Sequence, residues 1–263
     1  MAKPQAVVLT RPVAESLLWA NTIARAGFKV LSWPLIEVQP HADLMRIHTA
    51  LAAWHGYQAV MFVSRAAVQH AFQHQSPKAG WGLTRCWATG PGTRQALLDA
   101  GVPPELIDSP PLQAAQFDTE ALWRVVQPQL LPERGVLLLR GSDADKPASA
   151  DEGIGRDWLI NQLESAGIRV DSVAVYQRLL PVWDAPQQAQ ARTAAQDGSI
   201  WVFSSSQSIS HLKQLMPAQD WSLAKALVTH DRIGEAARQL GVGRVQVCKP
   251  RLSEVVASLE SFE

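Results

Sequence analysis

Short apolar runs alternate with amphipathic stretches along the chain. The runs are rich in Val, Ile, Leu and Phe, which is typical of strands that are buried on both faces of a parallel sheet. They occupy residues 6–9, 30–33, 59–63, 86–88, 136–139, 170–175, 200–203, 226–228 and 245–247. Between them, the stretches 14–26, 157–166 and 233–240 carry apolar residues at helical spacing. Strands that alternate with helices of this length predict an α/β fold with right-handed crossovers.

The same pattern occurs twice. Each unit of the pattern is an apolar strand, a short turn of Ser, Thr, Gly or Arg, and an amphipathic helix. Three such units in the first part of the chain have counterparts in the second part: 8–30 and 138–170, 60–66 and 201–207, and 88–102 and 228–242. This duplication predicts two similar α/β lobes rather than one large domain.

The order of the units predicts where the chain changes lobes. If the middle units form one lobe, the first unit must join the last two. Two extended segments that are bounded by proline lie at the expected crossing points, and they would pair as an antiparallel hinge. We therefore predict lobe 1 from residues 1–36 and 178–263, lobe 2 from 41–173, and linker strands at 34–40 and 172–181. The alternative is a single sheet in which both segments are ordinary strands.

Composition excludes several classes of partner. The 263 residues include 24 basic and 24 acidic side chains, and no basic tract suggests a nucleic-acid partner. No apolar run approaches the roughly 20 residues that a membrane-spanning helix needs. The first residues contain no signal-peptide pattern, so we expect a cytoplasmic protein with no membrane partner. Cys86 and Cys248 lie at or within apolar runs and are interpreted as buried free thiols.

The turns after the strands are candidate anion sites. In open parallel sheets, ligands bind at the carboxyl ends of the strands, where unpaired N–H groups of the next helix favour carboxylate or phosphate. Each Ser or Thr could simply cap a helix and each Arg could be a surface residue. Their repetition around one prospective cleft favours binding. The candidates are Thr10, Arg11, Ser64, Arg65, Thr89, Gly90, Arg140, Gly141, Ser204, Ser205, Ser206 and Thr229.

Three other features of the sequence are candidates for chemistry. Tyr176, one of two tyrosines, lies in the second linker strand, where its hydroxyl could donate a proton to a leaving group or simply fill the hinge. His70 and His74 share a helix face without an evident third ligand, which favours a solvated face over a metal site. Residues 141–155 are small and polar, which predicts a long loop, either an active-site cover or a harmless insertion.

The chain resembles the uroporphyrinogen-III synthase family over nearly its whole length. Each matching motif is weak by itself, but the ordered set is fairly specific. The motifs are Leu9-Thr-Arg-Pro12, Trp33-Pro-Leu-Ile-Glu37, Phe62-Val-Ser-Arg-Ala66, Ala88-Thr-Gly90, Leu138-Leu-Arg-Gly141, Val175-Tyr-Gln-Arg178, Phe203-Ser-Ser205 and Val228-Thr229.

This resemblance implies a fold and a reaction. The fold is a pair of flavodoxin-like lobes with parallel sheets, joined by a two-stranded antiparallel linker. The reaction closes the linear tetrapyrrole hydroxymethylbilane to uroporphyrinogen III in haem biosynthesis, with inversion of the terminal ring and loss of water. The resemblance implies that no metal or organic cofactor is needed. We expect the chain to be a monomer.

The resemblance also implies roles for individual residues. Tyr176 would assist departure of the hydroxyl group. Carboxylates would be bound by Ser64, Thr89, Ser204, Ser205 and Thr229. Family members commonly follow the Arg-Gly pair with a short glycine-rich turn and an arginine, whereas a longer segment separates Arg140-Gly141 from Arg156 here. Either Arg140 or Arg156 would therefore keep the binding role.

Two rival functions come from other classes. A non-catalytic two-lobed protein that binds a small polycarboxylate or other anion could use the same hinge and turns, and its Tyr176 would be dispensable. A glycosyltransferase-like enzyme would need a catalytic acid or base in the cleft, and the sequence offers no convincing candidate.

The neutral composition is compatible with hydroxymethylbilane, the substrate that the resemblance implies. This substrate carries eight carboxylates, and backbone dipoles can supply the local field that binds them.

Overall fold

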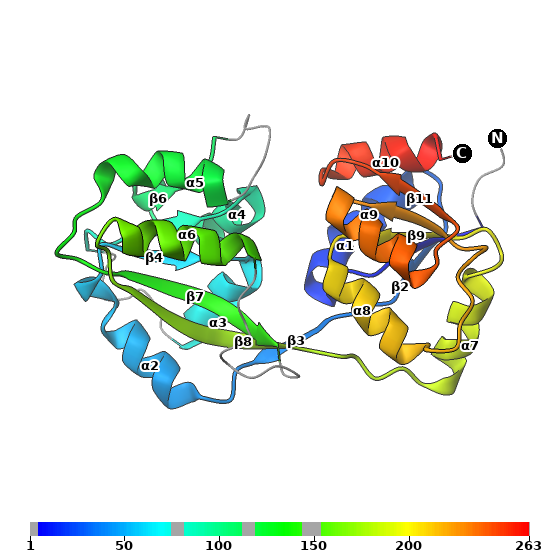
Figure 1. Ribbon diagram of the computed structural model, residues 1–263, viewed down its shortest axis with the longest axis horizontal. Coiled ribbons are helices and arrows are strands. Elements are labelled where there is room, and N and C mark those ends of the chain that lie inside the picture. Colours follow the sequence, from blue (N-terminus) through cyan, green and yellow to red (C-terminus); the bar gives the residue numbers. More distant parts are fainter. Residues whose placement is uncertain (1–4, 75–81, 112–118, 144–153, 263) are drawn as a thin grey trace. The chain divides into compact units, whose positions relative to one another are not determined.

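The computed structural model describes residues 5–74, 82–111, 119–143 and 154–262, and the chain divides into two compact units. Unit 1 combines Met1–Glu37 with Leu179–Glu263, and unit 2 is the continuous segment Val38–Arg178. Each unit has a sheet of its own with helices on both faces (Figure 1). The predicted α/β fold with two lobes of parallel sheets is confirmed.

The sheet of unit 1 is parallel. Its strands run in the order β11-β10-β9-β1-β2, and all four pairings between neighbours are parallel. Strands β1, β9 and β10 are fully or almost fully buried, as their continuous apolar sequences require. The strands are β1 (Val7–Leu9), β2 (Val30–Ser32), β9 (Ile200–Phe203), β10 (Lys225–Val228) and β11 (Arg244–Val247).

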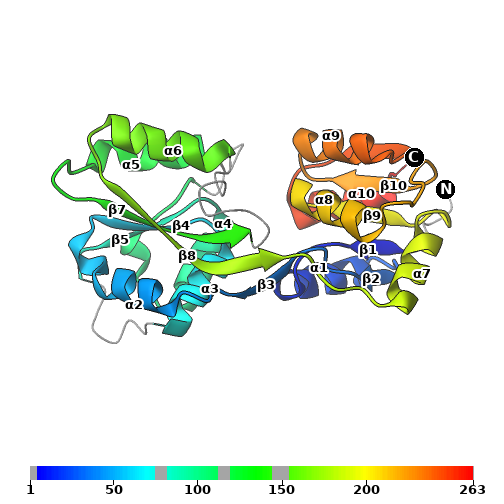
Figure 2. The same ribbon diagram turned by 60° about the horizontal axis from the view of Figure 1, so that its bottom comes forward.

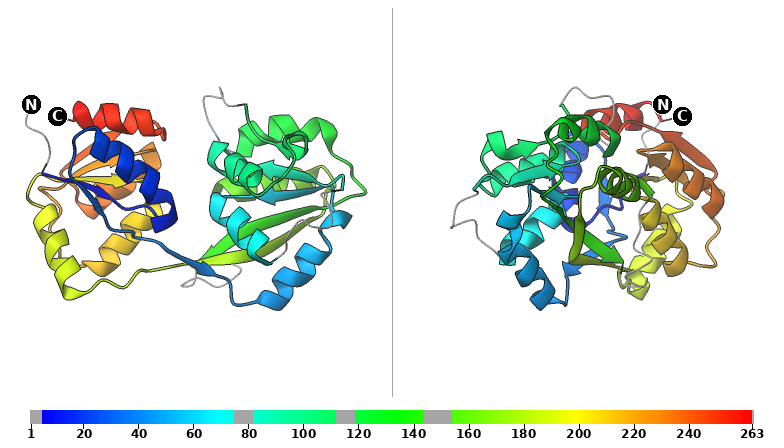
Figure 3. Two further views of the ribbon diagram at one scale, coloured as in Figure 1. Left: turned by 180° about the vertical axis from the view of Figure 1, so that it is seen from behind. Right: turned by 60° about the vertical axis from the view of Figure 1, so that its left-hand side comes forward.

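Helices cover both faces of this sheet. Alternate residues of each strand point to opposite faces, so Val7 and Leu9 pack on one side and Val8 packs on the other. The Val7 side holds α1 (Val13–Arg25) and α10 (Leu252–Glu260), the dark blue and red helices of Figure 3. The Val8 side holds α7 (Ala185–Ala194), α8 (Ser206–Leu215) and α9 (Asp231–Leu240).

Unit 2 repeats this plan with a longer pair of strands. Its sheet has the order β3-β8-β7-β4-β5-β6, and the pairings from β8 to β6 are parallel. Figure 2 shows β7 and β8 as the long neighbouring strands of this sheet. The strands are β3 (Glu37–Pro40), β4 (Ala59–Phe62), β5 (Arg85–Ala88), β6 (Ile107–Asp108), β7 (Val136–Asp143) and β8 (Val170–Leu179).

Two separate cores lie on the two faces of the unit 2 sheet. One core packs the sheet against α2 (Leu44–Ala52), α3 (Arg65–His74) and α4 (Pro91–Asp99). The other packs it against α5 (Thr119–Val126) and α6 (Ile154–Ser165), which Figure 2 shows on the opposite side. Short 3-10 helices complete the unit at Trp54–Gly56, Pro104–Leu106 and Gln127–Gln129.

The two crossing segments form the linker. Strand β3 lies beside β8, and the backbone N–H of His41 donates to the carbonyl of Val175. On the unit 1 side, Trp33 and Trp183 pack edge-to-face with ring centroids 6.2 Å apart. The two tryptophans therefore fix the outgoing and the returning chain to the same core. The predicted two-stranded antiparallel linker is confirmed as part of the fold.

Two details of the prediction were wrong. Residues 141–143 are not loop, because β7 continues to Asp143 and pairs with β8, and α6 already begins at Ile154. The rest of the predicted loop, 144–153, lies outside the described residues. The two-residue strand β6 was not predicted, because its sequence is too short to show a pattern.

Within the described ranges, no helix combines the length and apolarity needed to cross a bilayer.

Candidate functional site

Several predicted site residues gather at one edge of the unit 2 sheet. Strands β8, β7, β4 and β5 are neighbours and parallel, so their carboxyl ends share an edge. Ser64 and Arg65 follow β4, and Thr89 and Gly90 follow β5. Arg140 and Gly141 lie in the second half of β7, and Tyr176 lies in the second half of β8.

Tyr176 is held by contacts on several sides. Its side chain is buried and belongs to the core beneath α2, α3 and α4. Its hydroxyl oxygen lies 3.1 Å from Oγ of Ser64, and either group can be the donor. Its ring stacks on the imidazole of His70, with centroids 5.7 Å apart and planes inclined by 23°. The phenol therefore has one fixed orientation at the start of α3.

Ser64 connects this tyrosine to the helix. Its Oγ also accepts a hydrogen bond from the backbone N–H of Ala67, so the side chain caps α3. Gly90 occupies the cap position before α4 and has no side chain to offer, which leaves N–H groups of the first turn unpaired by a cap. Thr89 donates to the carbonyl of Val63 across 3.4 Å. These helix starts are suited to carboxylates.

Unit 1 has a corresponding edge. Strands β10, β9 and β1 are parallel neighbours, and their carboxyl ends carry Thr229, Ser204–Ser206 and Thr10. Ser205 caps α8, since its Oγ accepts from the N–H of Gln207 at 3.2 Å. The buried Oγ of Ser206 has no hydrogen-bond partner among the described residues. Thr229 is buried, and its N–H donates to the carbonyl of Phe203.

The side chains of Thr10 and Arg11 are engaged inside unit 1. Thr10 is fully buried, and its hydroxyl donates to the carbonyl of Val202 at 2.7 Å. Arg11 pairs with Glu15 at 2.5 Å, and its guanidinium lies 4.4 Å from the ring centroid of Trp19. The Thr10 hydroxyl is therefore engaged within the unit, whereas the buried Nε of Arg11 has no hydrogen-bond partner among the described residues.

The structure corrects the interpretation of His70 and leaves Arg156 open. His70 was interpreted as part of a solvated helix face, but it is half-buried because Tyr176 covers its ring. The side chains of His74 and Arg156 lie outside the described residues, although both belong to helices. The choice between Arg140 and Arg156 therefore stays a prediction.

Sequence reasoning missed two features at these edges. His230 caps α9, because its Nδ1 accepts from the N–H of Arg232 at 3.1 Å; histidine is an uncommon cap and carries no clear sequence signal. Asp143 and Arg178 form an ion pair at 2.7 Å at the ends of β7 and β8. Opposite charges at the ends of two neighbouring strands could have signalled this pair, but only with the register known.

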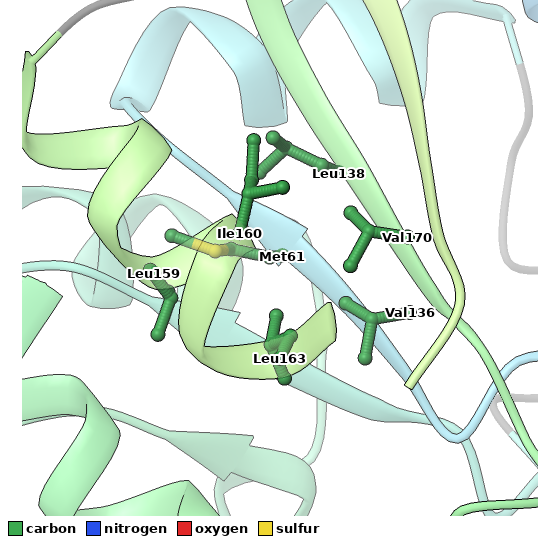
Figure 4. A pocket seen from close by; sticks show the side chains of 7 residues that line it. All are labelled: Met61, Val136, Leu138, Leu159, Ile160, Leu163 and Val170. Carbon is green, nitrogen blue, oxygen red and sulfur yellow. The ribbon is translucent and has the colours of Figure 1, made fainter. Parts of the chain in front are cut away.

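One small pocket in unit 2 is not part of the edge. It lies between the sheet and α6 and is drawn in Figure 4. Every side chain around it is aliphatic or a thioether, so it offers no group that could bind an anion. It is a packing gap in the α6 core, lined by Met61, Val136, Leu138, Leu159, Ile160, Leu163 and Val170.

The chain is similar to known proteins over nearly its whole length. The family described as uroporphyrinogen-III synthase HemD matches residues 18–257. A uroporphyrinogen-III synthetase structure from Helicobacter pylori has a TM-score of 0.58 and 17% identity, covering 98% of this chain and 100% of that one. A mutant uroporphyrinogen III synthase from Thermus thermophilus has a TM-score of 0.54 and 21% identity, covering 98% and 97%. The structures support the fold, and the family match extends through both units.

Proposed function

The chain belongs to the uroporphyrinogen-III synthase family, and we propose that it closes hydroxymethylbilane to uroporphyrinogen III with inversion of the terminal ring and loss of water. The family match over residues 18–257 carries this proposal. The edge of unit 2 supports it, because a fixed phenol hydroxyl lies beside a helix start that can hold a carboxylate. In this proposal, the ring closure uses a shaped anion site and one proton donor.

The carboxylates of the substrate are bound by helix starts in both units. In unit 2, the starts of α3 and α4 provide Ser64, Arg65, Thr89 and Gly90. In unit 1, the starts of α8 and α9 provide Ser204–Ser206 and Thr229. Helix dipoles, together with the N–H groups that the caps leave unpaired, favour anions there although the formal net charge is zero. Distributed contacts of this kind impose the folded geometry that ring inversion requires.

Tyr176 assists departure of the substrate hydroxyl. Ser64 already accepts the N–H of Ala67, and it can donate its own proton to the Tyr176 oxygen. The phenol proton is then free to be donated to the departing hydroxyl, which leaves as water, and the proton lost on ring closure restores the phenol. Departure of water leaves an azafulvenium cation, and attack on it gives a spiro intermediate. That intermediate fragments by breaking the bond between the spiro carbon and the original bridging carbon, and the new cation recloses with the ring inverted and a proton lost. Because the ring is buried, only the hydroxyl would meet the substrate.

An isomer assay tests the function. Hydroxymethylbilane is supplied enzymatically, the protein is added, the products are oxidised and the porphyrin isomers are separated. We expect the type III isomer in excess over the protein-free control, which yields type I by spontaneous closure. Type I alone would contradict the proposal and leave an anion-binding protein as the better description.

A tyrosine pair tests the proton donor. Tyr176→Phe should lower kcat by up to about 100-fold with little change in KM, because the variant keeps the ring and loses only the proton. Tyr57→Phe is the matched control, because Tyr57 is the second tyrosine of the chain. Its hydroxyl donates to Asp171 at 2.8 Å, and we place neither residue in the site. An undiminished rate in Tyr176→Phe would show that its hydroxyl is structural.

We also propose that the protein acts in the cytoplasm as a monomer. The monomer is supported by the cores, since each is built from residues of a single unit. Light scattering during gel filtration, with and without substrate, measures the oligomeric state, and cell fractionation measures the location. A stable dimer at working concentration would contradict the first part.

A further inference from the structure

A bulge in β8 determines which way Tyr176 points. Arg140 of β7 lies opposite Ala174, but the next residue, Gly141, lies opposite Tyr176, so Val175 is an extra residue in β8. Side chains alternate along a strand, and Val175 faces the core beneath α2, α3 and α4. Without the extra residue, Tyr176 would face the α5 and α6 side. The bulge instead places both consecutive side chains in the same core.

The ring of Tyr176 lies directly over Gly141. A Cβ atom on Gly141 would overlap the ring and come within 2.9 Å of the phenol oxygen. The backbone of Gly141 does not itself require glycine, because its φ is not in the left-handed region. An alanine would therefore fit the strand conformation but not the space. Glycine at this position is explained by the tyrosine that covers it.

The tyrosine has no easy place to move. It is only 4% exposed, so a displaced ring would meet other core atoms. Its hydroxyl contact with Ser64 and its stacking on His70 both depend on the present position. A shift of about 1 Å, the scale that relief of the overlap requires, is enough to weaken a catalytic alignment by about 100-fold.

We propose that Gly141, together with the bulge at Val175, forms a seat for the phenol ring and is a positioning residue for Tyr176. Gly141 then acts through the tyrosine and needs no contact with substrate, which differs from the direct binding role that the sequence suggested. The catalytic consequence rests on the proposed function, whereas the seat itself is a statement about structure. The two can be tested separately.

Tyrosine NMR tests the seat without any assay of activity. Tyrosine labelled with carbon-13 at Cζ should give two resonances, because the chain has two tyrosines, and Tyr57→Phe assigns them. Gly141→Ala should shift the Tyr176 resonance and leave that of Tyr57 in place. Gly92→Ala is the control, since outside its chain neighbours and the backbone of its own helix no atom lies within 4 Å of the added carbon. A folded Gly141→Ala protein with an unmoved Tyr176 resonance would overturn the proposal.

Kinetics then test the link to catalysis. Gly141→Ala should lower kcat by about 10- to 100-fold and change KM by less than about twofold. In a Tyr176→Phe background the same substitution should cause little further loss, because the hydroxyl that it misplaces is already gone. Losses that multiply would instead show that Gly141 acts on the substrate by itself. If neither the unsubstituted protein nor any variant forms the type III isomer, the proposed function is wrong. The NMR result would still show whether Gly141 positions the ring of Tyr176.

A second-site variant covers the case in which Gly141→Ala does not fold. The destabilisation would then come from overlap between the new methyl group and the phenol ring. Tyr176→Ala removes that ring, so the double variant should regain the unfolding midpoint of Tyr176→Ala alone. A double variant that remains unfolded would show that Gly141 is needed for another reason and would overturn the seat.

Discussion

Polar side chains at the strand ends differ in how free they are to meet a ligand. The Thr10 hydroxyl is committed to a carbonyl in its own unit, whereas the buried Nε of Arg11 and the buried Oγ of Ser206 lack a hydrogen-bond partner among the described residues. From the sequence alone, all three residues are equally good candidates for binding an anion, because each follows an apolar run. Their difference arises from the neighbouring strand or helix, which a single sequence does not reveal. Within the candidate set, hydrogen bonding therefore ranks Ser206 above Thr10 as a direct ligand.

The free thiols give a prediction about alkaline pH. Burial raises the pKa of Cys86 to about 12 and that of Cys248 to about 11. Because these pKa values are higher in the folded than in the unfolded protein, burial of the neutral thiols contributes to the free energy of unfolding. The contribution is complete at any pH below about 8.5, the pKa of a cysteine in the unfolded chain. This stability is lost as the pH rises from about 9 to the folded values. We expect the midpoint of urea unfolding to fall over that range.

Alkylation measures the same effect for each thiol. At pH 8, iodoacetamide should modify half-buried Cys248 slowly and fully buried Cys86 more slowly still, whereas both should react rapidly in urea. Peptide mass spectrometry separates the two sites. Equal rates for Cys86 in the native and the denatured protein would contradict the prediction.

Elements with continuous apolar sequences could be predicted, because a strand buried on both faces must be apolar throughout. Strand β9 was predicted to the residue, and β1, β4 and β10 differ by one residue at one end. The second half of β7 could not be predicted, since Gly141 and Ser142 are strand only through pairing with β8. The bulge at Val175 depends on register between two strands and has no local signal. The chemically important detail of the site is thus non-local.

The start of α3 gives a prediction for one helix. Ser64→Ala should lower the free energy of unfolding by about 1 kcal/mol, because Ala67 loses its cap acceptor. It should also lower kcat, because the Tyr176 hydroxyl loses the oxygen that orients it. Urea unfolding and the isomer assay measure the two effects.

A second cap separates stability from catalysis. Asp184 caps α7 and accepts from the N–H of Gln187 at 2.7 Å, on a helix that we do not place in the site. Asp184→Ala should cost a similar free energy of unfolding but leave kcat unchanged. If both variants lose the same activity, loss of a cap alone explains the effect, and Ser64 has no special relation to Tyr176.

At the scale of the whole molecule, the continuous unit has the contents of an independent domain. Both of its cores are built only from residues within Val38–Arg178. Its length of about 140 residues is ordinary for a single domain. We expect a protein made of residues 38–178 alone to fold, with cooperative urea unfolding and a Tyr176 resonance at the position seen in the full chain. A segment without cooperative unfolding would show that unit 2 depends on unit 1.

The same segment should be inactive. It keeps Tyr176, Ser64 and Gly141, but it lacks the starts of α8 and α9 that we assign to carboxylates in unit 1. If the tyrosine alone were sufficient, a folded segment would still form some type III isomer above the protein-free control. If a folded segment gives only the type I isomer, the proton donor is not sufficient by itself. Without the anion contacts of unit 1, the substrate then closes spontaneously without inversion. That outcome would place the control of ring inversion in substrate geometry, to which the tyrosine contributes only the proton.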